Sequence, residues 1–157
     1  MDLKPITLKG FEKLEIELKN LKQVERPEIV EAISAARELG DLSENAEYQS
    51  AKEKQALIDR RIRYLEMMSA NSEIIDPSKL SGETVMFGAT VKLQDVDEDV
   101  EKTYQIVGEY EADLNHGLIS NDSPIARALL RKSVGDEITV RTPSGEKYFE
   151  IKQVKFA

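Results

Sequence analysis

Several side-chain chemistries are missing from this sequence. It contains no cysteine and no tryptophan, and its single histidine is His116. Disulfides and thiolate zinc sites are therefore excluded, and any metal would have to be held by oxygen atoms or by His116. No segment approaches the roughly 18 consecutive apolar residues that a membrane span requires, and the amino-terminal residues do not show a cationic segment followed by an apolar run. We expect a cytoplasmic protein without a membrane partner.

Positive charge is also scarce relative to negative charge. One third of the 157 residues are charged, and the net charge is −8. The overall field therefore repels nucleic acid and anionic membrane surfaces, so that any contact with nucleic acid must be local. With 40% hydrophobic residues, the chain is long enough for one ordinary domain or two small ones.

Apolar side chains in the first half follow the three-four spacing of a helix that buries one face. The register comprises Phe11, Leu14, Leu18, Leu21, Glu25, Glu28, Ala32, Ala35 and Leu39. Pro27 removes a backbone hydrogen bond, so we expect a kink there and not the end of the helix. A second register predicts another helix that ends near Asn71. It comprises Tyr48, Ala51, Gln55, Ile58, Ile62 and Leu65.

The two registers match when the chain folds back about Asp41 and Leu42, because apolar positions then face apolar positions. We therefore predict an antiparallel coiled-coil hairpin over residues 1–76, with a functional tip at residues 40–48. Each arm of about 30 residues would extend roughly 45 Å, which is too long and thin for a substrate pocket of its own. A dimerising coiled coil is the alternative, but the turn signal and the mirrored registers favour intramolecular pairing and a monomer.

The second half has the pattern of a small α+β domain. Pro77 and Ser78 indicate a boundary, and we expect a linker over residues 77–82 before a domain at 83–157. Four segments have the composition of strands, namely 90–93, 103–109, 137–140 and 148–156. Pro143, Ser144 and Gly145 would make the last two strands a hairpin. The whole chain is therefore expected to belong to the α+β class.

Asp41 and Glu44 lie beside the helix-breaking Gly40 and allow two interpretations. Asp followed three residues later by Glu is typical of a capping box at the start of a helix. Alternatively, two carboxylates at an exposed tip can take one or two positions around a hydrated Mg²⁺ ion if a partner supplies the others, and can orient a water for phosphodiester cleavage. On their own they would bind the ion weakly at best.

Arg37 and Lys52 flank the tip, and either contact phosphate or are simply solvated.

Other charged or polar groups carry weaker signals. The run from Asp95 to Asp99 lacks the glycine and distal glutamate of a calcium loop, so we interpret it as a solvated hairpin turn. His116 lies in an expected loop without a nucleophile arrangement around it. Ser123 and Pro124 fit the cap and first position of a short helix that continues through Ile125 to Leu130.

Two long motifs closely resemble those of the bacterial Gre transcript cleavage factors, a family of transcription elongation factors. The first comprises residues 40–48 with 51–53, and the second comprises 104–113, 117–120 and 123–129. The resemblance covers essentially the whole chain. It implies an amino-terminal antiparallel coiled coil and a carboxy-terminal domain similar in fold to the FKBP prolyl isomerases.

The same resemblance implies how such a factor works. The globular domain would dock at the rim of the RNA polymerase secondary channel, and the coiled coil would reach inward to the 3′ end of a backtracked nascent RNA. Asp41 and Glu44 would help hold a second Mg²⁺, shared with the polymerase, and activate water. The polymerase would then cut its own RNA and resume elongation. The factor would have no cofactor of its own and would not be an enzyme.

Further roles follow from matching positions. Lys52 matches a position that is basic in the family and is a candidate for steering the RNA end, and Arg37 is a second candidate. Ser123, Pro124 and Ile125 would lie near the docking surface. Gln49 departs from the family, where histidine is common, so that a mechanism needing an imidazole at this place is not supported.

Two alternatives keep part of this interpretation. The protein could occupy the channel as an inhibitor without stimulating cleavage, although the retained acids argue against it. The second domain could instead be an active prolyl isomerase, which would need an aromatic, apolar pocket. Several of the aromatic side chains of this half should fill the core of so small a domain, and a fold by itself does not carry a function.

Overall fold

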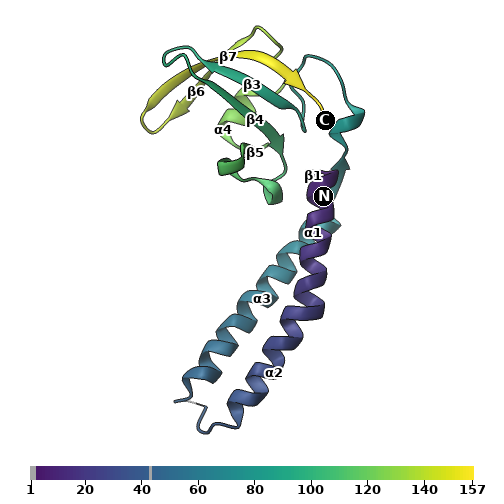
Figure 1. Ribbon diagram of the computed structural model, residues 1–157, viewed down its shortest axis with the longest axis vertical. Helices are drawn as coiled ribbons and strands as arrows, with labels where there is room; N and C mark the ends of the chain where they lie inside the picture. Colours follow the sequence, from purple (N-terminus) through teal and green to yellow (C-terminus); the bar gives the residue numbers. More distant parts are fainter. Residues whose placement is uncertain (1–2, 43) are drawn as a thin grey trace. The chain divides into compact units, whose positions relative to one another are not determined.

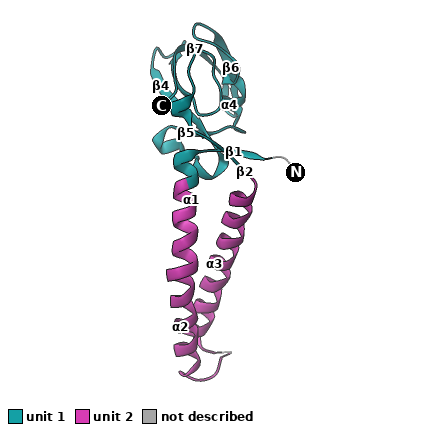
Figure 2. Cartoon of the chain, turned by 90° about the vertical axis from the view of Figure 1, so that its right-hand side faces the viewer, with its two compact units in different colours: residues 1–11, 72–157 teal, residues 12–71 magenta. Residues whose placement is uncertain are grey.

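The structure, a computed structural model, describes residues 3–42 and 44–157 and consists of two compact units (Figure 1). One unit comprises residues 12–71. The other combines the chain up to Phe11 with Ser72–Ala157 (Figure 2). These distant segments belong together because strand β1, Lys4–Thr7, pairs in parallel with strand β2, Ser72–Ile75. No helix in the described part of the chain is both long and apolar enough to cross a membrane.

The helical unit is the predicted antiparallel hairpin. Helix α1, Leu8–Asn20, continues through a π-helical turn, Leu21–Glu25, into α2, Arg26–Arg37, and the chain returns as α3, Ala46–Ala70. Three partly exposed ion pairs cross between the arms, namely Arg26–Asp59 at 2.9 Å, Arg61–Glu17 at 2.6 Å and Lys22–Glu66 at 2.9 Å. Exposed pairs contribute about 0–1 kcal/mol each, so packing of the apolar side chains is what stabilises the hairpin.

The buried face of the first arm departs from the predicted register after Leu21. The structure buries Ile29, Ile33 and Ala36, whereas the predicted positions Glu28, Ala32, Ala35 and Leu39 are exposed. The cause is the π-helical turn, in which the backbone N–H of Arg26 donates to the carbonyl of Leu21 five residues earlier. Such a turn accommodates one additional residue, and the register downstream shifts by one. The helix continues past Pro27 as expected.

This explanation predicts the effect of a deletion. Removing the exposed Gln23 would bring Ile29 and Ile33 into the same regular spacing as Leu14 and Leu21, so the π-helical turn would no longer be needed. We expect a regular α-helix and a free energy of unfolding within about 1 kcal/mol of the intact chain. Circular dichroism and thermal unfolding would measure both. Deleting the buried Leu21 serves as the matched variant and should be clearly destabilising; equal losses for the two deletions would contradict the explanation.

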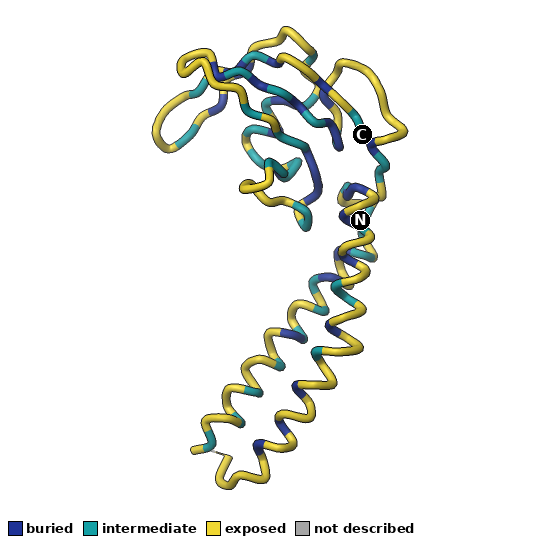
Figure 3. Tube along the Cα trace, in the orientation of Figure 1, coloured by how far each residue is buried: buried dark blue, intermediate teal, exposed yellow. Residues whose placement is uncertain are grey.

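The second arm agrees with its predicted register. All six predicted positions, Tyr48, Ala51, Gln55, Ile58, Ile62 and Leu65, are buried or partly buried. The helix ends as expected at Asn71, whose backbone N–H and side-chain Nδ2 both donate to the carbonyl of Met67, at 3.1 and 2.9 Å. Figure 3 shows how narrow the buried stripe of the hairpin is.

The second unit contains a five-stranded sheet with the strand order β5-β4-β3-β7-β6. Its strands are β3 Thr90–Asp95, β4 Glu101–Val107, β5 Leu118–Ser120, β6 Glu137–Thr142 and β7 Gly145–Lys155. The four predicted strands and the last hairpin are confirmed. Strand β5 was not predicted because three residues are too short for a pattern, and it is held by parallel pairing with β4.

The core of this unit lies between the sheet and helix α4, Pro124–Leu129. Ala126 and Leu129 of α4 are fully buried against sheet residues such as Leu93 and Ile151.

Short 3₁₀ turns occupy Pro77–Lys79, Glu109–Glu111 and Leu114–His116. Pro77, in the segment expected to be a linker, is buried, and a Cβ at Gly88 would lie 3.0 Å from its ring.

A carboxylate joins the first turn of α1 to this unit. Glu111 accepts hydrogen bonds from the backbone N–H groups of Thr7 and Gly108, each at 3.0 Å, and from the Thr7 hydroxyl. The same hydroxyl accepts from the N–H of Gly10 at 3.1 Å. A Cβ at Gly10 would overlap the Glu111 carboxyl group, so glycine is required for this close approach. We call this group of bonds the Glu111 anchor.

Candidate functional site

The tip, residues 40–48, connects α2 to α3 and begins with a glycine that the backbone requires. Gly40 has a φ of +133°, which side chains other than hydrogen rarely allow. The backbone N–H of Glu44 donates to the carbonyl of Asp41 at 3.3 Å, so a turn brings these two residues together. Asp41 and Glu44 are both exposed. Ser43, within the tip, lies outside the described residues.

The capping-box interpretation of the two acids is wrong. Helix α3 begins at Ala46, and its cap is Asn45, whose Oδ1 accepts from the backbone N–H of Tyr48 at 3.0 Å. Asparagine satisfies the same donors that an aspartate would satisfy at this position. Neither Asp41 nor Glu44 is therefore required as the cap of α3. Helix capping therefore does not explain the two acids.

Two amide side chains at the tip make bonds that the sequence did not reveal. Besides capping α3, Asn45 donates through Nδ2 to the carbonyl of Ala36 near the end of α2, at 2.5 Å. Gln49 donates through Nε2 to the carbonyl of Leu42 at 3.0 Å. Asn45 could have been recognised as a cap, since asparagine is as good a cap as aspartate. Nothing in the sequence indicates the bonds to Ala36 and Leu42, which depend on the hairpin bringing these residues together.

Arg37 and Lys52 meet on one side of the hairpin next to the tip. The Arg37 guanidinium lies 5.8 Å from the centre of the Tyr48 ring, a cation–π distance. Lys52 Nζ lies 3.3 Å from Gln55 Oε1. Both cations border an open hollow of about 250 Å³, whose other lining residues are Val30, Ile33, Ser34 and Gln55. The structure therefore brings the two predicted cations together at a surface that phosphate could approach.

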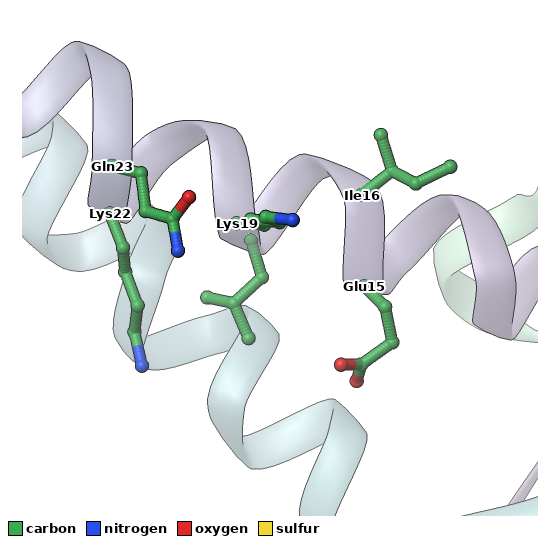
Figure 4. A pocket seen from close by; sticks show the side chains of 6 residues that line it. Glu15, Ile16, Lys19, Lys22 and Gln23 are labelled. Atoms are coloured by element: carbon green, nitrogen blue, oxygen red, sulfur yellow. The ribbon is translucent and has the colours of Figure 1, made fainter.

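A larger hollow of about 440 Å³ lies away from the tip (Figure 4). Its lining comes entirely from α1 and the π-helical turn, and comprises Glu15, Ile16, Leu18, Lys19, Lys22 and Gln23. Charges on an exposed helical face are usually solvated or paired, as Lys22 is with Glu66, and no nucleophile or paired carboxylate lies among the lining residues. This hollow does not combine groups that could carry out a reaction.

Two other sequence candidates have structural roles. Asp95 is 2% exposed, and its Oδ1 accepts from the backbone N–H groups of Glu98 at 3.1 Å and Asp97 at 3.0 Å. The bond from Glu98, followed by the one from Asp97, holds the pKa of Asp95 below its ordinary value against the opposing effect of burial. The turn is confirmed, but its expected solvation is wrong for Asp95, which is buried while residues 96–99 are exposed. His116 is exposed in a 3₁₀ turn, with Nδ1 2.6 Å from the Asp113 carboxylate.

The expected docking residues open helix α4. Ser123 is its cap, and its hydroxyl accepts from the backbone N–H of Ala126 at 3.3 Å, as predicted. Pro124 is exposed in the first turn, whereas Ile125 is half-buried against the core of the sheet unit. Helix capping explains Ser123 and packing against the core explains Ile125, whereas Pro124 lies exposed at the surface.

Comparison with known families defines the class of protein. Residues 4–74 match the family model described as "Transcription elongation factor, N-terminal". Residues 80–156 match "Transcription elongation factor, GreA/GreB, C-term". Both units thus belong to one class, the transcription elongation factors.

Two GreA proteins agree with this class over almost the full length. The chain is 60% identical to transcription elongation factor GreA of Rickettsia felis, over 97% of this chain and 94% of that protein. It is 56% identical to GreA of Methylobacterium sp. strain 4-46, over 99% of each. The crystal structure of GreA factor homolog 1 from Thermus thermophilus shares 27% identity, over 98% of this chain and 99% of that one, with a TM-score of 0.45.

The chain belongs to the GreA/GreB family of transcription elongation factors. It acts with RNA polymerase and stimulates cleavage of the transcript. The polymerase catalyses the hydrolysis, and the factor itself is not an enzyme.

Proposed function

We propose that Asp41 and Glu44 are the groups through which this factor stimulates transcript cleavage. The observation that carries the proposal is that both carboxylates are exposed at the turn while Asn45, a different residue, caps α3. The two acids can therefore be turned toward a partner without unravelling the helix. The hairpin would reach into the polymerase secondary channel and present them beside the 3′ end of a backtracked RNA.

The donor set at the tip fits a shared Mg²⁺ ion. Carboxylate oxygens are ligands that Mg²⁺ prefers, but two of them leave most of its six positions to water and to the polymerase. No group of three or more potential ligand residues occurs in the described part of the chain. Asp41 and Glu44 would hold the ion jointly with the polymerase, and when bound it would supply charge stabilisation at the phosphodiester. The factor needs no cofactor of its own for this.

Side chains at and beside the tip would also orient the attacking water and the RNA end. A carboxylate of Asp41 or Glu44 can accept a hydrogen bond from the attacking water and orient it toward the phosphorus atom. Arg37 and Lys52, which border the neighbouring hollow, would attract the phosphates of the RNA end. This local positive charge offsets the net charge of −8 where the RNA would approach.

The sheet unit would provide the attachment to the polymerase. Ser123, Pro124 and Ile125, at the start of α4, are the residues proposed to lie at the rim of the secondary channel. The factor would act as a monomer in the cytoplasm. Intramolecular packing of α2 against α3 supports the monomer, because it already buries the apolar stripe of each arm.

The test is RNA cleavage in a deliberately backtracked elongation complex at varied Mg²⁺ concentrations. Because Asp41 and Glu44 add ligands for the ion, we expect the intact factor both to accelerate cleavage and to lower the Mg²⁺ concentration at half-maximal rate. A factor that binds the polymerase without accelerating cleavage would instead be a channel-occupying inhibitor. Acceleration with an unchanged Mg²⁺ requirement would contradict the shared-ion part of the proposal.

A further inference from the structure

Three side-chain hydrogen bonds tie the tip to the two helices that carry it. Asn45 Nδ2 donates to the carbonyl of Ala36, Asn45 Oδ1 accepts from the N–H of Tyr48, and Gln49 Nε2 donates to the carbonyl of Leu42. We call these three bonds the tip clamp. Asn45 takes part in two of them and is partly buried.

Asn45 bonds to both helix ends with one amide group. Its Oδ1 accepts from Tyr48, one of the first N–H groups of α3, which have no partners within the helix, at 3.0 Å. Its Nδ2 donates at 2.5 Å to the Ala36 carbonyl, which also accepts from the backbone N–H of Leu39 at 3.1 Å. Aspartate and serine would cap α3 equally well, but neither can at the same time donate an amide N–H to Ala36. The requirement for asparagine therefore goes beyond helix capping.

The third bond acts on the turn that holds the acids. Leu42 immediately follows Asp41 and lies two residues before Glu44, and its carbonyl is held by Gln49 in the first turns of α3. Through this bond and the two of Asn45, the backbone at Leu42 is connected to α3, and α3 to the end of α2. The clamp thus restricts how far the two carboxylates can move relative to the hairpin.

We propose that Asn45 is a positioning residue for transcript cleavage, which holds the ends of α2 and α3 together so that Asp41 and Glu44 are presented in one orientation. The proposal rests on the proposed function of the two acids. Misplacing a catalytic group by about 1 Å can reduce a rate by roughly 100-fold, so an interaction that does not touch RNA can still control the rate. Binding of the polymerase does not depend on it.

The test compares variants that separate the two bonds of Asn45. Asn45→Ser and Asn45→Asp keep an acceptor for Tyr48 and lose the amide N–H that donates to Ala36. We expect both to lower the maximal cleavage rate roughly 10- to 100-fold at saturating factor. The factor concentration at half-maximal rate, the helical content and the thermal midpoint should stay at the values of the intact chain. Gln49→Met, which leaves both helix ends unchanged, should lower the maximal rate by a smaller factor.

A matched control is available at the other end of α3. Asn71 also donates its Nδ2 to a backbone carbonyl, that of Met67 at 2.9 Å, but lies far along the chain from the acids. Asn71→Ser should leave the maximal rate unchanged. An unchanged maximal rate in Asn45→Ser would overturn the positioning role, as would a lower rate accompanied by an equal loss of helical content.

The amide variant Asp41→Asn with Glu44→Gln distinguishes the two proposals. If this variant is inactive while Asn45→Ser is fully active, only the positioning role fails. If the amide variant still stimulates cleavage, the proposed function of the acids fails, and the positioning role that rests on it fails as well.

Discussion

Asp41→Asn combined with Glu44→Gln is expected to reduce factor-stimulated cleavage by about 100-fold or more, without weakening attachment to the polymerase. Losing a single preorganised electrostatic contact in an active site typically costs about 10²- to 10³-fold in rate. The amides have nearly the same size as the acids but carry no charge and are poor ligands for Mg²⁺. The effect therefore comes from charge and not from shape.

A loss of cleavage in this variant would not be caused by loss of helix α3. Asn45 caps α3, so the two substitutions leave the start of the helix intact. Each single substitution should give an intermediate loss, because one carboxylate remains. The rate of RNA cleavage in a backtracked complex, together with the factor concentration at half-maximal effect, measures rate and attachment separately.

Glu38→Gln is the matched control for the tip acids. Glu38 is an exposed acid directly after α2 and lies outside the tip. Its neutralisation lowers the local negative charge by the same amount as either single variant, but should change cleavage by less than about twofold, since screened surface charges contribute little. If Glu38→Gln and the tip variants had equal effects, the result would indicate general electrostatics and contradict a specific role for Asp41 and Glu44.

Glu111→Ala is expected to lower the free energy of unfolding by about 2–4 kcal/mol. The substitution removes the acceptor of three hydrogen bonds and leaves the partly buried N–H groups of Thr7 and Gly108 without their carboxylate. Total stabilities of single domains are about 5–15 kcal/mol, so this is a large fraction. Chemical denaturation followed by circular dichroism would measure it.

Two further variants separate the Glu111 anchor from surface charge. Glu111→Gln keeps a carbonyl oxygen for the two backbone N–H groups, and its amide can donate to the Thr7 hydroxyl, so we expect less than half of the loss. Glu109→Gln removes an exposed ion pair with Lys4, at 3.7 Å, and should cost no more than about 1 kcal/mol. Equal losses for Glu111→Gln and Glu111→Ala, or no loss in either, would contradict the anchor.

The π-helical turn explains why the buried face of the first arm could be predicted only in part. Leu14 and Leu21 follow the heptad spacing from the start of the helix and are buried. Beyond them the same spacing selects Glu28 and Ala32, although Ile29 and Ile33 are the residues that pack. One extra residue can be absorbed anywhere along a helix at small cost, and only packing against α3 determines where.

At the tip, too, the sequence predicted one part of the structure and missed another. The Gly40, Asp41 and Glu44 pattern predicts a turn that presents two acids, and both are exposed there. Aspartate and asparagine are nearly equivalent as caps, so the pattern could not distinguish Asp41 from Asn45 as the start of α3. The side-chain bonds to Ala36 and Leu42 join residues that meet only after the hairpin closes.

The sequence by itself determined the α+β class, the antiparallel hairpin, the four longer strands and the family to which the chain belongs. These features arise from patterns repeated along continuous segments, or from motifs of adjacent residues. The tertiary structure decided the pairing of β1 with β2, the bond network of Glu111 and the two-sided role of Asn45. The pairing of β1 with β2 and the bonds of Glu111 to Thr7 join segments distant in sequence, and the bonds of Asn45 join the ends of two helices across a turn. Each depends on particular donors and acceptors that meet only in the folded chain, so that no periodic signal precedes it.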